Sequence, residues 1–153
     1  MIEPDEGGVR IAFCRKMADK TLREHGVKSP PVPVEQIASS LGFEMREVVL
    51  PRGVDARLRT DGTERVIELA AGQNAHRHRF SIAHELGHFI LRHQEQVSKV
   101  AEGEANRFAG ALLAPGRWVA PDFRKGLKME ALVARYDVSS QVLFIALKNA
   151  KVI

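Results

Sequence analysis

Residues 79–91 read Arg79-Phe-Ser-Ile-Ala-His84-Glu85-Leu-Gly-His88-Phe-Ile-Leu91 and place a His-Glu-x-x-His motif inside an unbroken helical pattern. Positions i and i+4 of a helix lie one turn apart on the same face, so His84 and His88 can bind one metal ion together. Glu85 is turned about 100° away from His84, where it can act on a water molecule as a general base without binding the metal. Two imidazoles and a carboxylate at this spacing are what a zinc hydrolase requires.

Apolar side chains surround the three polar ones on almost every side of this helix. They are Ile82, Ala83, Leu86, Phe89, Ile90 and Leu91. A helix that is apolar all round is expected to be buried. Buried histidine and glutamate side chains need partners, and a metal ion supplies one. The alternative is an ordinary core helix whose histidines only form hydrogen bonds.

The length and composition indicate one soluble globular domain over residues 1–153. The net charge of +4 is spread along the chain, which does not by itself indicate nucleic-acid binding. The single cysteine, Cys14, excludes an internal disulfide and a cysteine-rich zinc site. No apolar run is long enough to span a membrane, and residues 1–6 are acidic rather than signal-like, so we expect a cytoplasmic protein.

Changes in hydrophobic period divide the chain into four parts. We expect N-terminal helices in 1–42, a small sheet in 43–71, the motif helix in 75–93, and a further helix with C-terminal helices in 98–153. The predicted strands cover 43–50, 54–60 and 65–70, with Asp61-Gly62 as a hairpin turn. Segment 115–123 fits either a short helix or a loop. The fold class is α+β, with a small antiparallel three-stranded sheet flanked by helices.

A third metal ligand is expected from the predicted helix 98–113, because catalytic zinc usually takes three protein ligands. Glu104 borders the apolar stripe of this helix, so its carboxylate can point inward, and we favour it. Glu102 lies on the flank shared with Asn106 and is the second candidate. Both could instead be solvated charges near a helix N-terminus, where acidic residues are favoured anyway.

Two runs of sequence carry a family resemblance. The first, from Arg77 to His88, ends in His-Glu-Leu-Gly-His, and the second reads Glu102-Gly-Glu-Ala-Asn-Arg-Phe and continues to Pro115. Together with Gly26-Val27 and the prolines after it, they resemble the ImmA/IrrE family of metallopeptidases over almost the whole chain.

This resemblance implies a zincin-like fold with His84, His88 and Glu104 as ligands of one Zn²⁺ ion and Glu85 as the general base. Mn²⁺ or another divalent ion would also suit such ligands. The resemblance further implies limited cleavage of a partner helix-turn-helix repressor, which relieves repression in a stress response. The expected partner is therefore a protein substrate, with no direct nucleic-acid binding and no membrane.

Several supporting roles stay open. Tyr136, His76, His78 and His93 are candidates for stabilising the oxyanion of the transition state. Asn106 could orient a ligand through a hydrogen bond, or simply face solvent.

An extended substrate adds as a strand to the edge of the sheet in zincin-like folds. The nearest predicted strand in sequence to the motif helix holds Arg65, Val66, Ile67, Glu68 and Leu69, and we expect it to be that edge.

Two other classes of function compete with the peptidase. Residues 132–148 resemble a helix-turn-helix in outline, but the would-be recognition helix is apolar and has little to offer base edges. A non-catalytic, metal-containing module could instead inactivate a repressor by binding. The intact Glu85 argues against that module, because metal binding alone does not require it.

Overall fold

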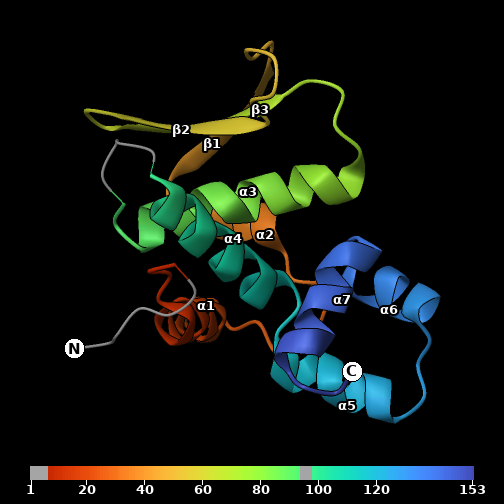
Figure 1. Ribbon diagram of the computed structural model, residues 1–153. Helices are drawn as coiled ribbons and strands as arrows, with labels where there is room; N and C mark the ends of the chain where they lie inside the picture. Colours follow the sequence, from red (N-terminus) through yellow and green to blue (C-terminus); the bar gives the residue numbers. More distant parts are fainter. Residues whose placement is uncertain (1–6, 94–97) are drawn as a thin grey trace.

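Helix α3 (Ala75–Ile90), which carries the motif, crosses the middle of the molecule between a small sheet and helix α4 (Lys99–Leu113) (Figure 1). The computed structural model describes residues 7–93 and 98–153, so the acidic residues 1–6 lie outside the described part. Both helices begin at side-chain caps: Asn74 accepts a hydrogen bond from the Arg77 backbone N–H, and Ser98 from that of Ala101, each at 3.0 Å.

The sheet contains β1 (Phe43–Val48), β2 (Ala56–Asp61) and β3 (Glu64–Ala70), in the spatial order β1-β3-β2. The predicted hairpin between β2 and β3 is present, but its turn lies one residue later, at Gly62-Thr63, because Asp61 pairs with Glu64; Gly62 has a φ of +55°. The prediction of a wholly antiparallel sheet is wrong, because β1 pairs with β3 in parallel. After β1, residues 49–55 cross past the position next to β1 and lead into β2. The chain then turns back, and β3 fills the position between β1 and β2.

Close approach of α3 and α4 brings the two metal-site sequences together. Gly87 makes this possible: a Cβ built there would lie 3.0 Å from Phe108 Cδ1 and 3.2 Å from the Ala105 backbone. The buried core around the contact draws on β3, α3 and α4, and includes Ile67, Leu69, Ile82, Leu86, Phe108 and Leu112. Apolar burial therefore fixes the distance between the motif helix and α4.

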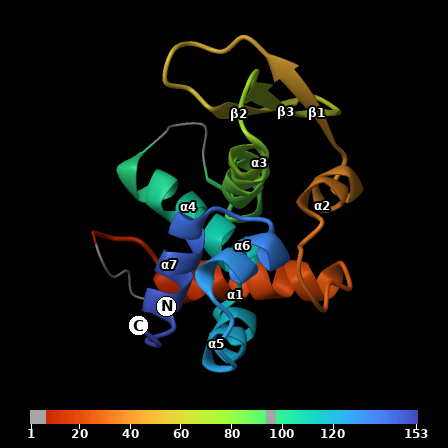
Figure 2. The same cartoon turned by 90° about the vertical axis from the view of Figure 1, so that its right-hand side faces the viewer.

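Of the remaining helices, α1 (Ile11–Glu24) and the C-terminal helix contact α4, whereas α2 (Val34–Ser40) packs against α3 and β1. Helix α1 packs against α4 on the side away from the sheet, and α2 leads into β1 (Figure 2). Helices α5 (Gly116–Arg124), α6 (Met129–Tyr136) and α7 (Ser140–Asn149) complete the C-terminal part, so the ambiguous segment 115–123 is mostly helical.

The predicted α+β class is confirmed. Among the described residues, no helix has both the length and the apolar character needed to cross a bilayer.

Candidate metal centre

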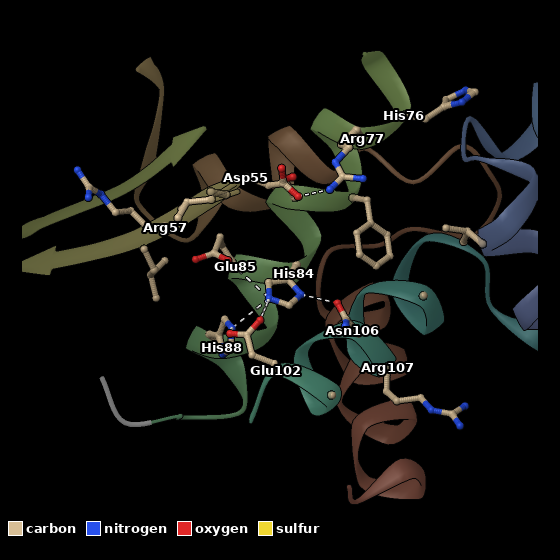
Figure 3. A pocket seen from close by; sticks show the side chains of 18 of the residues that line it. Asp55, Arg57, His76, Arg77, His84, Glu85, His88, Glu102, Asn106 and Arg107 are labelled. Carbon is tan, nitrogen blue, oxygen red and sulfur yellow. Dashed lines mark hydrogen bonds and ion pairs between the residues drawn. The ribbon is translucent and has the colours of Figure 1, made fainter. Parts of the chain in front are cut away.

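The two motif histidines point from the same face of α3 into a cleft between β2 and α4 (Figure 3). Their Nε2 atoms lie 3.2 Å apart, and each side chain is about 15% exposed. The i, i+4 spacing thus has the consequence expected from the sequence: two imidazole donors aimed at one point.

The third donor at that point is Glu102. Its Oε2 lies 3.0 Å from His84 Nε2, and its Oε1 lies 2.9 Å from His88 Nε2. Ligands of a tetrahedral zinc ion, each about 2.0–2.1 Å from the metal, lie about 3.3 Å from one another. The donor separations of 2.9–3.2 Å therefore fit a small divalent ion with three protein ligands.

The structure does not bring Glu104, the predicted third ligand, to the Nε2 atoms of the two histidines. Its Oε2 accepts hydrogen bonds from the Arg10 backbone N–H at 2.9 Å and Arg10 Nε at 2.7 Å. Its Oε1 accepts from Arg10 Nη2 at 2.9 Å and lies 2.9 Å from His93 Nε2. All four lone-pair positions of the carboxylate are occupied. The inward orientation predicted for Glu104 is correct, but it serves an ion pair rather than the histidine pair.

Glu85 stands back from the three donors. It is buried, and its Oε2 lies 3.8 Å from His84 Nε2, inside a His84, Glu85 and His88 group whose donor atoms all lie within 4.8 Å of one another. Glu102 is nearer to both histidines, so Glu102 is the better ligand and Glu85 the better base. Burial, and next the charge of Glu102, raise the pKa of Glu85 to about 7, against a hydrogen bond from the Leu58 backbone.

Each histidine is held through its other ring nitrogen. His84 Nδ1 lies 2.7 Å from the side-chain oxygen of Asn106, so the supporting contact considered for Asn106 is present. His88 Nδ1 lies 2.9 Å from His93 Nδ1, and His93 in turn reaches Glu104. Burial and the neighbouring His84 lower the pKa of His88. Arg10 holds the pKa of Glu104 down, at about 2.

The cleft above the site has a volume of about 1740 Å³ and continues from β2 past α3 and α4 to α7. The prediction that residues 65–69 form the substrate-facing edge is wrong, because β3 is paired on both sides. The edge that borders the cleft is β2. Ala70 donates to the Asp55 carbonyl at 2.8 Å, and hydrogen-bonded pairs alternate along an antiparallel ladder. Ala56, Leu58 and Thr60 therefore direct their backbone groups away from β3.

The other predicted side chains lie elsewhere. Tyr136 is fully buried and donates its hydroxyl to Asp122 at 2.7 Å, so it does not face the cleft. His78 pairs with Glu35 at 3.7 Å, also outside the cleft. His76 lines the cleft and lies 3.2 Å from Asp137, whereas His93 supports His88. Of the residues involved, Arg10 had no local signal in the sequence, because its partner lies 94 positions away.

A model of the peptidase M78 family, described as the IrrE N-terminal-like domain, matches residues 38–148, which is most of the chain. The chain belongs to this family. The match includes the sheet, the motif helix and α4, and therefore every donor of the site, while Arg10 precedes it. A search of curated proteins gives no significant match for this M78 domain.

The fold of the M78 domain is also found in a solved structure, a Mycobacterium tuberculosis transcriptional regulator. The two align with a TM-score of 0.62 and 21% sequence identity, over 86% of this chain. At that identity the likeness concerns the fold alone. The M78 domain spans 45% of the regulator, so about half of that protein has no counterpart here.

Proposed function

We propose that this M78 domain is a zinc-dependent endopeptidase that makes a limited, site-specific cut in a partner helix-turn-helix repressor and thereby relieves repression. The observation that carries this proposal is the convergence of His84, His88 and Glu102 within 3.2 Å of one another, with buried Glu85 beside them. Membership of a peptidase family supports the same reaction class. Imidazole and carboxylate donors suit zinc, although they also accept other divalent ions.

The chain's own residues supply the proton transfers. When bound, the metal ion would act as a Lewis acid that polarises both the water and the scissile carbonyl. Glu85 takes the proton of the attacking water and delivers it to the leaving amine. Burial raises the pKa of Glu85 in the metal-free protein, which favours a carboxylate that can accept the proton and then release it. His84 and His88 would hold the metal through Nε2, because Asn106 and His93 contact their Nδ1 atoms and so orient both rings.

The cleft favours an extended substrate over a compact one. The outward backbone groups of Ala56 and Thr60, and the Leu58 carbonyl, can pair with a peptide running along β2, which would bring the peptide past Glu85. A flexible linker between folded domains can adopt that conformation without unfolding its protein. A repressor as the partner is supported by the family resemblance, and by the name of a protein with the same fold, a transcriptional regulator.

The first experiment measures metal content by elemental analysis of the wild type, His88→Ala and Glu102→Ala. We expect about one zinc per chain in the wild type and a loss in both variants. An absence of metal from the wild type, even after reconstitution with zinc, would overturn the proposal.

The second experiment uses Glu85→Gln as a trap. This variant keeps all three donors, so it should bind zinc and retain the substrate without cutting it, whereas the wild type releases two fragments. If Glu85→Gln relieves repression as well as the wild type does, the protein acts by binding and is not a peptidase.

A further inference from the structure

The far side of His88 is supported by a chain of three residues from three parts of the fold. His88 Nδ1 lies 2.9 Å from His93 Nδ1, just beyond the end of α3. His93 Nε2 lies 2.9 Å from Glu104 Oε1 on α4. Arg10, at the start of α1, then forms a two-pronged ion pair with Glu104 at 2.7 and 2.9 Å. We name His93, Glu104 and Arg10 the His88 relay.

With a metal ion on His88 Nε2, one arrangement of hydrogens satisfies every contact in the relay. Ionised Glu104 can only accept, so His93 carries its hydrogen on Nε2. The bare Nδ1 of a neutral His93 then accepts from the Nδ1–H of His88. His88 is left with a bare Nε2, and that atom faces His84 and Glu102. This arrangement is the one that is compatible with a metal ion on His88 Nε2, and the relay contacts hold the ring so that Nε2 faces the site.

Arg10 is fixed from more than one side. Its backbone N–H also donates to Glu104, and its guanidinium lies 4.5 Å from the centre of the Phe13 ring. The preceding residue, Val9, packs against α4 so closely that a Cβ on Gly103 would come within 2.8 Å of Val9 Cγ2. The segment before α1 is therefore built onto the helix that carries Glu102 and Glu104.

The two motif histidines are supported in different ways. His84 relies on one neutral group, the Asn106 amide, which is exposed. The two inner members of the His88 relay are buried, with the Glu104 side chain 3% and the His93 side chain 10% exposed, whereas the Arg10 side chain at its outer end is 38% exposed. A buried, charged support with no freedom to turn is a stronger constraint on ring orientation than an exposed amide.

We infer that His93, Glu104 and Arg10 are positioning residues that hold His88 in its metal-binding orientation, so that the segment before α1 contributes to metal affinity. This inference rests on the proposed metal site, and it adds three supporting residues that lie outside the His-Glu-x-x-His motif. The effect acts through His88, and none of the three residues binds the metal itself.

The test measures zinc affinity by competition with a chromogenic chelator. The variants are Glu104→Gln, His93→Phe and Arg10→Gln, and Asp122→Asn is the matched control. Asp122 is also a buried carboxylate with an arginine partner, Arg135 at 2.9 Å, but it lies outside the cleft. We expect zinc affinity to fall about 10- to 100-fold in the three relay variants and to change less than about twofold in the control.

Nitrogen-15 NMR of histidine in the zinc-loaded wild type provides a readout that simple destabilisation would not produce. The relay requires a hydrogen on Nδ1 of His88 and on Nε2 of His93. The reverse assignment on His93 would overturn the inference even if Glu104→Gln fails to fold. His93→Phe keeps a ring in the same space, so it separates the lost hydrogen bonds from lost packing.

Failure of the relay and failure of the metal site give different results. A wild type that binds zinc, together with relay variants that bind it equally well, overturns the relay alone. A wild type that binds no zinc overturns the proposed function as well.

Discussion

At the scale of single residues, Glu104 couples the stability of the fold to pH. Arg10 holds the pKa of Glu104 at about 2, below its ordinary value of 4.5. A carboxyl whose pKa is lowered by folding stabilises the folded state above its unfolded pKa. That stabilisation is lost as the pH falls from about 4.5 towards 2.

We therefore predict that Glu104→Gln lowers the free energy of unfolding of the metal-free protein at pH 7 by about 1–2 kcal/mol, allowing for the partly exposed Arg10. The difference from the wild type should shrink steadily as the pH falls to 3. Urea unfolding between pH 3 and 7 measures it. Glu44→Gln, at an exposed ion pair with Arg46, serves as the control and should show little effect at any pH. A difference independent of pH would contradict the assignment.

The residue scale also shows where the sequence is informative about the site. His84, Glu85 and His88 lie on one helix, so their relative positions follow from helical geometry alone. The choice between Glu102 and Glu104 depends on how α4 is rotated against α3 and on a partner at Arg10. Both factors depend on tertiary packing. The apolar stripe next to Glu104 predicts that Glu104 is buried, but it does not identify Arg10 as the partner.

At the scale of elements, the contact between α3 and α4 is limited by Gly87. A methyl group there would meet Phe108 at 3.0 Å and the Ala105 backbone at 3.2 Å, and backbone cannot rotate away. We predict that Gly87→Ala lowers the free energy of unfolding by about 1–3 kcal/mol, because α4 must shift. It should also weaken zinc binding, since Glu102 moves with α4. Urea unfolding and chelator competition measure the two effects.

Gly110→Ala on α4 is the matched control for stability, since nothing lies within 4 Å of its added methyl group. This change should stabilise the protein by roughly 0.5–1 kcal/mol, because alanine favours a helix over glycine. Equal effects of the two substitutions would show that the close approach at Gly87 is unimportant.

The edge strand β2 provides a second element-scale prediction. The Thr60 backbone N–H points away from β3, so Thr60→Pro removes a donor from the cleft without breaking the β2–β3 ladder. We expect cleavage of the trapped substrate to slow at least about tenfold while the melting temperature changes little. Arg59→Pro removes an N–H that faces β3 and should instead destabilise the sheet. Unchanged cleavage by Thr60→Pro would argue against substrate pairing along β2.

Only part of the strand pairing in the sheet can be predicted from the sequence. The β2–β3 hairpin depends on a local turn, which lies at Gly62-Thr63, one residue from the predicted Asp61-Gly62, and the strand bounds agree with the prediction within a residue or two. The position of β1 depends on which side of β3 the chain crosses through residues 49–55. Alternation of apolar residues does not specify that choice, so the parallel pairing and the identity of the edge strand were missed.

At the scale of the whole molecule, metal binding should be linked to stability. An ion that binds only the folded state stabilises it by about 2.7 kcal/mol at a concentration 100 times its dissociation constant. We therefore predict that zinc raises the melting temperature of the metal-free protein by roughly 5–10 °C. Differential scanning calorimetry with and without zinc measures this shift. His88→Ala should show almost none, and an equal shift in that variant would place the zinc elsewhere.

The division of the site between two helices has a consequence for the life of the protein in a cell. His84 and His88 belong to α3, whereas Glu102 and Asn106 belong to α4, and only native packing around Gly87 brings them together. A newly made or damaged chain in which the two helices have separated keeps its complete motif but has only half of its ligand shell. If the domain is the peptidase proposed above, such a chain would not cut neighbouring proteins, because the donors come together only when folding is finished.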